Sequence, residues 1–219
     1  MGRGEDIIIR IATKADSDFI IEAILQAEKS GTDRCALLKL WNCNENQLRT
    51  YLRSILDEEI DGTEWSIDNF VIAESSGHSI GAFAGWIEGE NEWGLSSSTL
   101  KANLMKACLP IDVIVKMSHF QTEIQAVQIP RTQGALQLEY AYVVPGFQGK
   151  GVIQRIVEFI FHRYGNWSLA EVQVFANNSP AIQAYSKLGF VRTFETKPTI
   201  EDLGIFPYPI KLKMTKNKP

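Results

Sequence analysis

The chain has 219 residues, of which 45% are hydrophobic and 22% charged, and its formal net charge is −4. This composition is ordinary for a folded globular protein with one sizeable core, and it excludes a disordered or fibrous chain. The negative charge argues against a nucleic-acid surface and mildly favours cationic partners. No apolar run reaches membrane-spanning length and no signal-like segment is visible, so we expect a cytoplasmic location and no membrane contact.

The cysteines and histidines are scattered. Cys35, Cys43 and Cys108 are odd in number and contain no C-x-x-C pair, and the three histidines lie far apart. The sequence therefore predicts neither a disulfide framework nor a metal site.

The N-terminal half shows strand and helix periodicities in turn. The predicted elements are a strand over 7–11, a helix after Asp16 that carries Ile20 to Leu25, a short helix or loop over 31–46, a helix over 48–56 after a cap at Asn44 or Asn46, and a hairpin of 70–74 with 78–88. The second hairpin strand is poor in bulk at Gly81 and Gly85, which predicts that a backbone or a ligand comes close to it.

A helical insertion is expected at about 89–134. Ser97 or Ser98 is the predicted cap of a first helix, Pro110 breaks it, and 111–127 is predicted as a second helical segment. Its apolar residues indicate either a satellite core or the wall of a substrate site, and the sequence allows both.

A strand, a glycine-rich turn and a helix follow each other from residue 136. Apolar residues alternate over 136–142, Pro145 and Gly146 end the strand, and helical spacing begins after Gly151. The first amides of a helix lack internal partners and carry partial positive charge, so glycines there let a phosphate approach. The turn is neither a P-loop nor a G-x-G-x-x-G motif.

A second strand and helix come downstream. Alternation over 172–176 predicts a strand, and Ser179 with Pro180 predicts the start of a short helix that Gly189 ends. Another strand starts at Phe190. A last strand over 208–214 alternates apolar residues with lysines, which is typical of an edge strand.

These two segments together resemble the GNAT superfamily of N-acetyltransferases. In that family a strand leads into a Gln/Arg-x-x-Gly-x-Gly/Ala turn, which Gln148 and Gly151 fit. A later helix reads Asn-x-x-Ala-x-x-x-Tyr-x-x-x-Gly-Phe, which is fitted by Asn178, Ala181, Tyr185, Gly189 and Phe190. Two motifs in the expected order are much more specific than either one. The chain departs from the pattern at Ile153, where the family has its second Gly or Ala.

The resemblance implies an α/β (α+β) fold in a single domain over 1–219. We expect a mixed sheet of six or seven strands with flanking helices, splayed between the strand at 136–144 and the strand at 172–176. The helical insertion at about 89–134 precedes the central strand and has no counterpart in a minimal member of the family.

The resemblance also implies acetyl-CoA as co-substrate, with no metal or redox cofactor. Its pantetheine arm is expected to pair with strand backbone in the splay, and its pyrophosphate to meet the amides of the glycine turn. Asn178 either shapes a turn or hydrogen-bonds the cofactor arm. The residues expected to bind acetyl-CoA are Tyr142, Val143, Val144, Gln148, Gly149, Lys150, Gly151, Val152, Ile153 and Asn178.

Acetyl transfer to an amine needs a base and an acid. A free alkylamine has a pKa near ~10.4, so it is mostly ammonium at neutral pH and must lose a proton before it attacks. The resemblance implies Glu139 as that base and Tyr185 as the acid that protonates the departing thiolate. Three alternatives stay open: Glu139 facing solvent, Tyr185 serving only in packing, and Tyr140 or Tyr142 contacting the substrate.

The function expected is N-acetyl transfer to a primary amine of a small molecule or peptide, without nucleic acid as a partner. The alternative is a catalytically weak CoA-binding sensor or assembly module of the same fold. Glu88, Glu90 and Glu92 follow the strand that precedes the central one, so they are expected either to attract a cationic acceptor or to form a solvated loop. The sequence leaves open whether the chain forms a homodimer.

Overall fold

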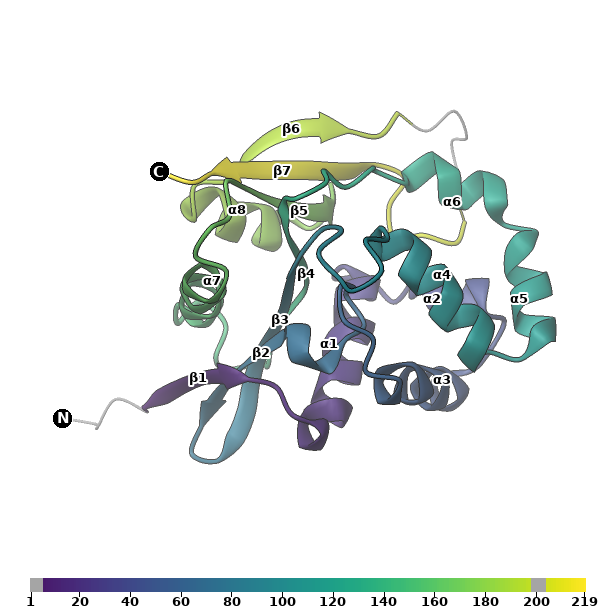
Figure 1. Cartoon of the computed structure of the whole chain (residues 1–219), viewed down its shortest axis with the longest axis horizontal. Helices are drawn as coiled ribbons and strands as arrows, with labels where there is room; N and C mark the ends of the chain where they lie inside the picture. The colour runs from purple at the N-terminus through teal and green to yellow at the C-terminus, as the bar shows by residue number, and fades with distance from the viewer. Residues whose placement is uncertain (1–5, 198–203) are drawn as a thin grey trace.

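The computed structural model describes residues 6–197 and 204–219, whose strands form one mixed sheet of seven in the order β1-β2-β3-β4-β5-β7-β6 (Figure 1). The strands are β1 (Ile7–Ile11), β2 (Phe70–Ser75), β3 (His78–Ile87), β4 (Leu136–Val143), β5 (Leu169–Phe175), β6 (Val191–Glu195) and β7 (Lys211–Asn217). Neighbouring strands are antiparallel except β4 and β5, which run parallel. The predicted mixed sheet is confirmed.

Helices cover both faces of the sheet, with α7 and α8 on one side and α1 to α6 on the other (Figure 1). The α-helices are α1 (Ser17–Lys29), α2 (Ala36–Leu40), α3 (Glu45–Asp57), α4 (Ser97–Cys108), α5 (Ile111–Ser118), α6 (Gln121–Val127), α7 (Val152–Arg163) and α8 (Ser179–Lys187), with short 3-10 turns at Lys14–Asp16 and Ile67–Asn69. Each face of the sheet has its own buried apolar cluster. Within the described ranges, no helix has the length and apolar character to span a membrane.

Two helix caps lie one residue earlier than the sequence predicts. Ser96 Oγ accepts the Thr99 N–H at 3.2 Å and begins α4. Asn178 Oδ1 accepts the Ala181 N–H at 3.2 Å and begins α8. In both cases several adjacent residues have capping side chains, and the chosen cap is the one whose oxygen reaches the N–H three residues ahead.

The insertion forms three helices rather than the two that were predicted. The segment 111–127 divides into α5 and α6, which are separated at His119 and Phe120. All three insertion helices lie on the α1 side of the sheet, beside α2 and α3 (Figure 1).

The prediction that the C-terminal strand lies at an edge is wrong. β7 pairs with β5 on one side and with β6 on the other, so β6 is the edge strand. Two lysines of β7 are held by protein acceptors: Lys216 Nζ donates to the Leu188 carbonyl at 2.6 Å, and Lys213 Nζ lies 3.2 Å from a Glu171 oxygen. Alternation of lysines with apolar residues indicates one polar face, which an internal strand can have as well.

The glycines of β3 make room for helix α7. A Cβ atom added at Gly81 would lie 2.7 Å from Val152 Cγ1, and one at Gly85 would lie 2.8 Å from Ile160 Cγ2. The close approach predicted for this strand is therefore that of a packed helix.

We expect Gly85→Ala to lower the free energy of unfolding by about 1–3 kcal/mol, because the new methyl group overpacks the β3–α7 contact at a β-branched side chain that cannot swing away. Gly165→Ala is the matched control, since its Cβ would meet its nearest atom, the His162 carbonyl oxygen, at 3.7 Å. The two substitutions restrict the unfolded chain equally. Denaturant unfolding measures both, and equal stabilities of the two variants would contradict the packing argument.

Candidate active site

The two parallel strands separate soon after they meet. β4 and β5 pair only from Leu136 opposite Ala170 to Leu138 opposite Val172. Beyond this point β4 continues along β3 and β5 continues along β7. The facing edges of β4 and β5 are therefore not paired with each other at their C-terminal ends. This is the splay that the family resemblance implies.

A bulge in β4 turns successive side chains to one face. Glu139 pairs with Ala84 and Tyr142 with Ala82, so two residues of β4 lie opposite Phe83 alone. One of the two is Tyr140, whose φ of 62° is rare for a bulky residue. Its hydroxyl accepts a hydrogen bond from Trp65 Nε1 at 3.2 Å, which helps to hold this backbone. As a result Glu139 and Tyr140 both line the α1 side of the sheet.

The glycine turn next to the splay is open and rich in amides. Gly149 and Gly151 both have φ of 76°, and a Cβ added at either would meet no atom within 4 Å. Gln148 steadies the turn by donating from Nε2 to the Val143 carbonyl at 3.1 Å. Across the described part of the chain, no acceptor takes the N–H groups of Val152 and Ile153. Bare amides in open space at a helix N-terminus fit a phosphate group.

Ile153 does not fill this space. Its side chain is half-buried and packs against the apolar cluster on the α7 side of the sheet. Lys150 is exposed, with its Nζ 4.6 Å from the centre of the Phe147 ring. The departure from the family pattern is thus absorbed by the core.

A cavity of about 480 Å³ opens beside the splay. The insertion helices form part of its wall through Met105, Met117 and Ile124. Four residues that the sequence predicts in the site line this cavity: Glu139, Tyr140, Asn178 and Tyr185. The insertion therefore serves as a wall as well as a satellite core.

Tyr185 is one of the residues that line this cavity. The residue is only 5% exposed, and its ring stacks on Phe83 with centroids 6.1 Å apart. Burial, together with the nearby Glu139 charge, raises the pKa of Tyr185 well above its usual range, so the phenol stays protonated at neutral pH. Its hydroxyl has no hydrogen-bond partner among residues 6–197 and 204–219.

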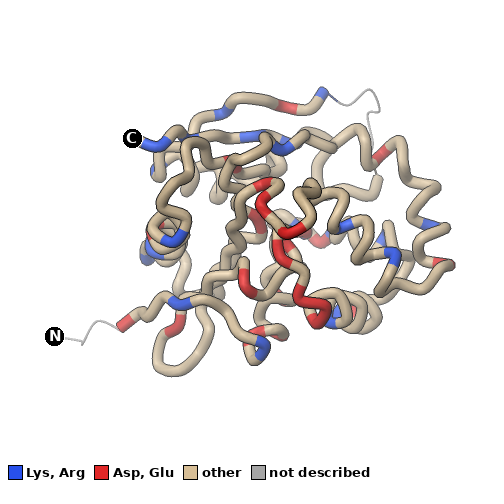
Figure 2. Tube along the Cα trace, viewed as in Figure 1, with Lys and Arg blue, Asp and Glu red and all other residues tan. Residues whose placement is uncertain are grey.

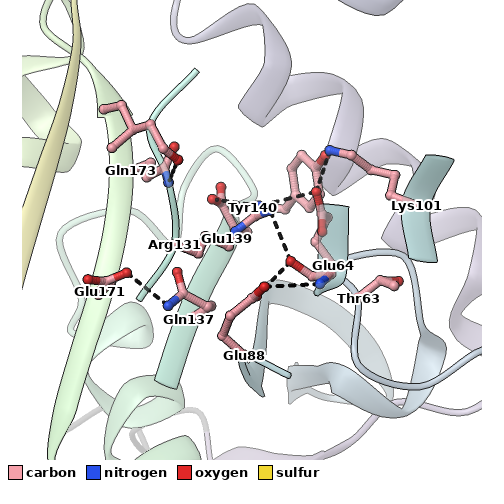
Figure 3. A network of polar contacts seen from close by, with 12 residues as sticks. Thr63, Glu64, Glu88, Lys101, Arg131, Gln137, Glu139, Tyr140, Glu171 and Gln173 are labelled. Carbon is pink, nitrogen blue, oxygen red and sulfur yellow. Dashed lines mark hydrogen bonds and ion pairs between the residues drawn. The ribbon is translucent and has the colours of Figure 1, made fainter. Parts of the chain in front are cut away.

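Glu139 belongs to a buried charge network (Figure 3). Arg131 Nη2 lies 3.3 Å from Glu139 Oε1 and 3.2 Å from Glu64 Oε1, and Lys101 Nζ lies 2.5 Å from the same Glu64 oxygen. The Arg131 guanidinium also stacks over the Trp86 ring at 5.1 Å. Burial alone would raise the pKa of Glu64, but the charges of Arg131 and Lys101 outweigh it and lower this pKa to about 2.

The three glutamates after β3 are not brought to the cavity. Glu88 is buried, and its carboxylate accepts hydrogen bonds from the Ser97 N–H at 3.0 Å and from the Ser97 hydroxyl at 2.6 Å. Glu90 and Glu92 are exposed. Acidic positions gather toward the middle of this side of the molecule (Figure 2), yet none of the three lines the cavity. The geometry gives no support to a role for them in attracting the acceptor.

Several cavity residues carried no local signal in the sequence. Arg131 lies in a loop before β4, and Glu28 and Lys211 lie within ordinary amphipathic elements. Glu64, which pairs with Arg131 behind the cavity lining, lies in the loop after α3. Of the two tyrosines that the sequence offers for substrate contact, Tyr140 lines the cavity, whereas the Tyr142 ring packs against Phe19 at 5.8 Å. Only the pairing of distant segments brings this set together.

Comparison with known proteins agrees with this geometry. The profile of the acetyltransferase (GNAT) family matches residues 38–190, which is more than half of the chain. The chain belongs to the GNAT acetyltransferase family. No curated protein sequence matches the GNAT chain significantly.

Solved structures of acetyltransferases share the fold of this GNAT chain. An N-acetyltransferase from Staphylococcus aureus Mu50 superposes with a TM-score of 0.69 at 12% sequence identity, covering 95% of this chain and 100% of its own. A second structure, described as an acetyltransferase, has a TM-score of 0.62 at 17% identity and covers 96% and 98%. At these identities the likeness establishes the fold, while family membership implies the use of acetyl-CoA.

Proposed function

We propose that this GNAT protein transfers the acetyl group of acetyl-CoA to a primary amine of a small molecule or peptide. The observation that carries the proposal is the junction of three features: the splay of β4 and β5, the open glycine turn at the start of α7, and the cavity that contains Glu139 and Tyr185. The backbone of Tyr142 to Val144 would hold the pantetheine arm, and the amides from Gln148 to Ile153 the pyrophosphate. Asn178 uses its Oδ1 as a helix cap, which leaves its Nδ2 for the cofactor arm.

Glu139 and Tyr185 carry out the proton transfers, Glu139 as the base and Tyr185 as the acid. Bound acetyl-CoA supplies the thioester carbonyl that the amine attacks. Glu139 collects the proton that the ammonium loses before attack. As the carbon–nitrogen bond forms and the carbon–sulfur bond breaks, Tyr185 donates its proton to the leaving sulfur, and the second proton lost by nitrogen restores the phenol. One proton is released to solvent in each turnover.

Acetyl-CoA should stabilise the native protein. A ligand that binds only the folded state adds about 2.7 kcal/mol to the free energy of unfolding at a hundredfold excess over its dissociation constant. Gly151→Val should weaken this effect, because a side chain would enter the space above the amides. Gly77→Val in the β2–β3 turn is the control, since Gly77 has nearly the same φ of 77° and equally open surroundings. It should show the same backbone strain and normal binding.

Thermal unfolding with millimolar acetyl-CoA measures both variants. Absence of a shift in the unsubstituted protein would contradict acetyl-CoA binding. Stabilisation without any release of CoA across a panel of amines would instead favour the alternative, a CoA-binding sensor or assembly module.

A further inference from the structure

One carboxyl group and one ammonium group face the cavity without ion-pair partners. Glu28, near the end of α1, accepts a hydrogen bond from the Tyr140 hydroxyl at 3.4 Å, and Lys211, at the start of β7, lies with its Nζ 5.7 Å from the centre of the Phe175 ring. Neither forms an ion pair with any described residue. The other cations of the cavity are paired, because Lys101 and Arg131 both contact Glu64.

Unpaired charges deep in a protein are costly, and deeply set ionisable groups are normally paired. Glu28 and Lys211 keep some solvent contact through the cavity, although protein surrounds them. Burial raises the pKa of Glu28 and lowers the pKa of Lys211. The attraction between these two charges opposes both shifts without cancelling them, so each group stays displaced toward its neutral form. A bound group of opposite charge would relieve each of them.

Both residues lie where the sheet splays. Lys211 stands opposite Phe175 in the β5–β7 register, at the end of β5 that has left β4. The end of α1 is tied to the same place, since Asn177 Nδ2 donates to the Ser30 carbonyl at 3.2 Å. Glu28 and Lys211 therefore approach the mouth of the splay from different elements.

We propose that the acceptor is a small molecule bearing both a primary amine and a carboxylate, as an amino acid does, with Glu28 and Tyr140 on the amine side and Lys211 on the carboxylate. This inference rests on the proposed acetyl transfer. A ligand with one ammonium and one carboxylate supplies a partner for each of Glu28 and Lys211, whereas a polyamine or a dicarboxylic acid would leave one of them without a partner.

The rest of the lining indicates an apolar side chain on this acceptor. Trp41, Met105, Phe175 and Phe206 line the cavity. Its volume of about 480 Å³ is within the range of small-molecule sites. Phenylalanine and methionine are therefore suitable probes.

The test compares each amino acid with the amine that lacks only its carboxylate: phenylalanine with phenethylamine, and methionine with 3-(methylthio)propylamine. A charge-assisted contact to the Lys211 ammonium in the cavity should give the amino acid a kcat/KM higher by about tenfold or more. Lys211→Met should remove this preference by lowering kcat/KM for the amino acid far more than for its amine. Glu28→Gln should raise KM for both members of a pair. Lys39→Met, at an exposed lysine of α2, is the control and should alter neither preference nor KM.

Equal kcat/KM for both members of each pair would overturn the inference while leaving the acetyltransferase function intact. If none of the probes is acetylated, calorimetric titration of the CoA-bound protein provides a second measurement. The amino acid should then bind about tenfold or more tighter than its amine, and Lys211→Met should abolish the difference. Equal binding, or no binding of either, would also overturn it.

Discussion

Replacing Tyr185 by phenylalanine is expected to lower turnover by ~10²-fold or more, while the affinity for acetyl-CoA changes little. The substitution removes one hydroxyl and keeps the ring that stacks on Phe83. Because the pKa of Tyr185 is raised, the phenol is a hydrogen-bond donor throughout the neutral range and first stabilises the developing charge on sulfur. Single-turnover kinetics, in which chemistry limits the rate, measure the effect.

The pH profile provides an independent check on this role. With a raised pKa, loss of the Tyr185 proton should not cause any decline of kcat between neutral pH and pH ~10, the usual value for tyrosine. Denaturant unfolding of Tyr185→Phe should give a stability close to that of the unsubstituted protein. An unchanged single-turnover rate would reduce Tyr185 to a packing residue.

Arg131→Met is expected to lower the free energy of unfolding by about 3–5 kcal/mol, the effect of breaking a buried ion pair by removing one partner. The Glu64 side chain is 2% exposed and that of Glu139 is 14% exposed. Without the guanidinium, Glu64 keeps only Lys101 as an ion-pair partner, and Glu139 keeps none among the described residues. Arg53→Met is the surface control, because its partner Asp18 is 92% exposed. Arg53→Met should lower the free energy of unfolding by less than about 1 kcal/mol.

The loss of unfolding free energy in Arg131→Met should depend on pH. The folded-state pKa of Glu64 is lowered from 4.5 to about 2, so its stabilising contribution is complete above pH 4.5 and disappears as the pH falls toward 2. The difference between Arg131→Met and the unsubstituted protein should therefore shrink across this window. The double variant with Glu64→Gln should recover part of the stability at neutral pH. A loss that is independent of pH and of Glu64 would mean that Arg131 acts through packing on Trp86 alone.

The glycine turn and the two motif helices could be predicted from the sequence because their signals are local. Period-two alternation marked β4, helical spacing after Gly151 marked α7, and the Asn178 to Phe190 segment carried the family pattern. The differences between prediction and structure at this level are small. The caps of α4 and α8 lie one residue earlier than predicted, and the helix predicted over 111–127 is two helices. Such signals come from contacts between residues a few positions apart, which a single sequence displays directly.

Local sequence patterns do not predict the bulge in β4. Simple alternation places Glu139 and Tyr140 on opposite faces of the sheet, whereas the structure puts both on the α1 side. The positive φ of Tyr140 is supported by the hydrogen bond from Trp65, a residue far away in the chain. Local propensity disfavours this backbone, so only tertiary contacts select it.

The sequence by itself determined the family, the order of the elements and the glycine turn, whereas the tertiary structure decided which charges meet. Glu28, Glu64, Arg131 and Lys211 come from a helix, two loops and the penultimate strand in sheet order, and none had a local pattern to mark it. The structure also buries Glu88 against Ser97, outside the cavity lining. Charge pairing in a cavity depends on distance and burial, and both are set by how distant segments pack rather than by neighbours in the chain.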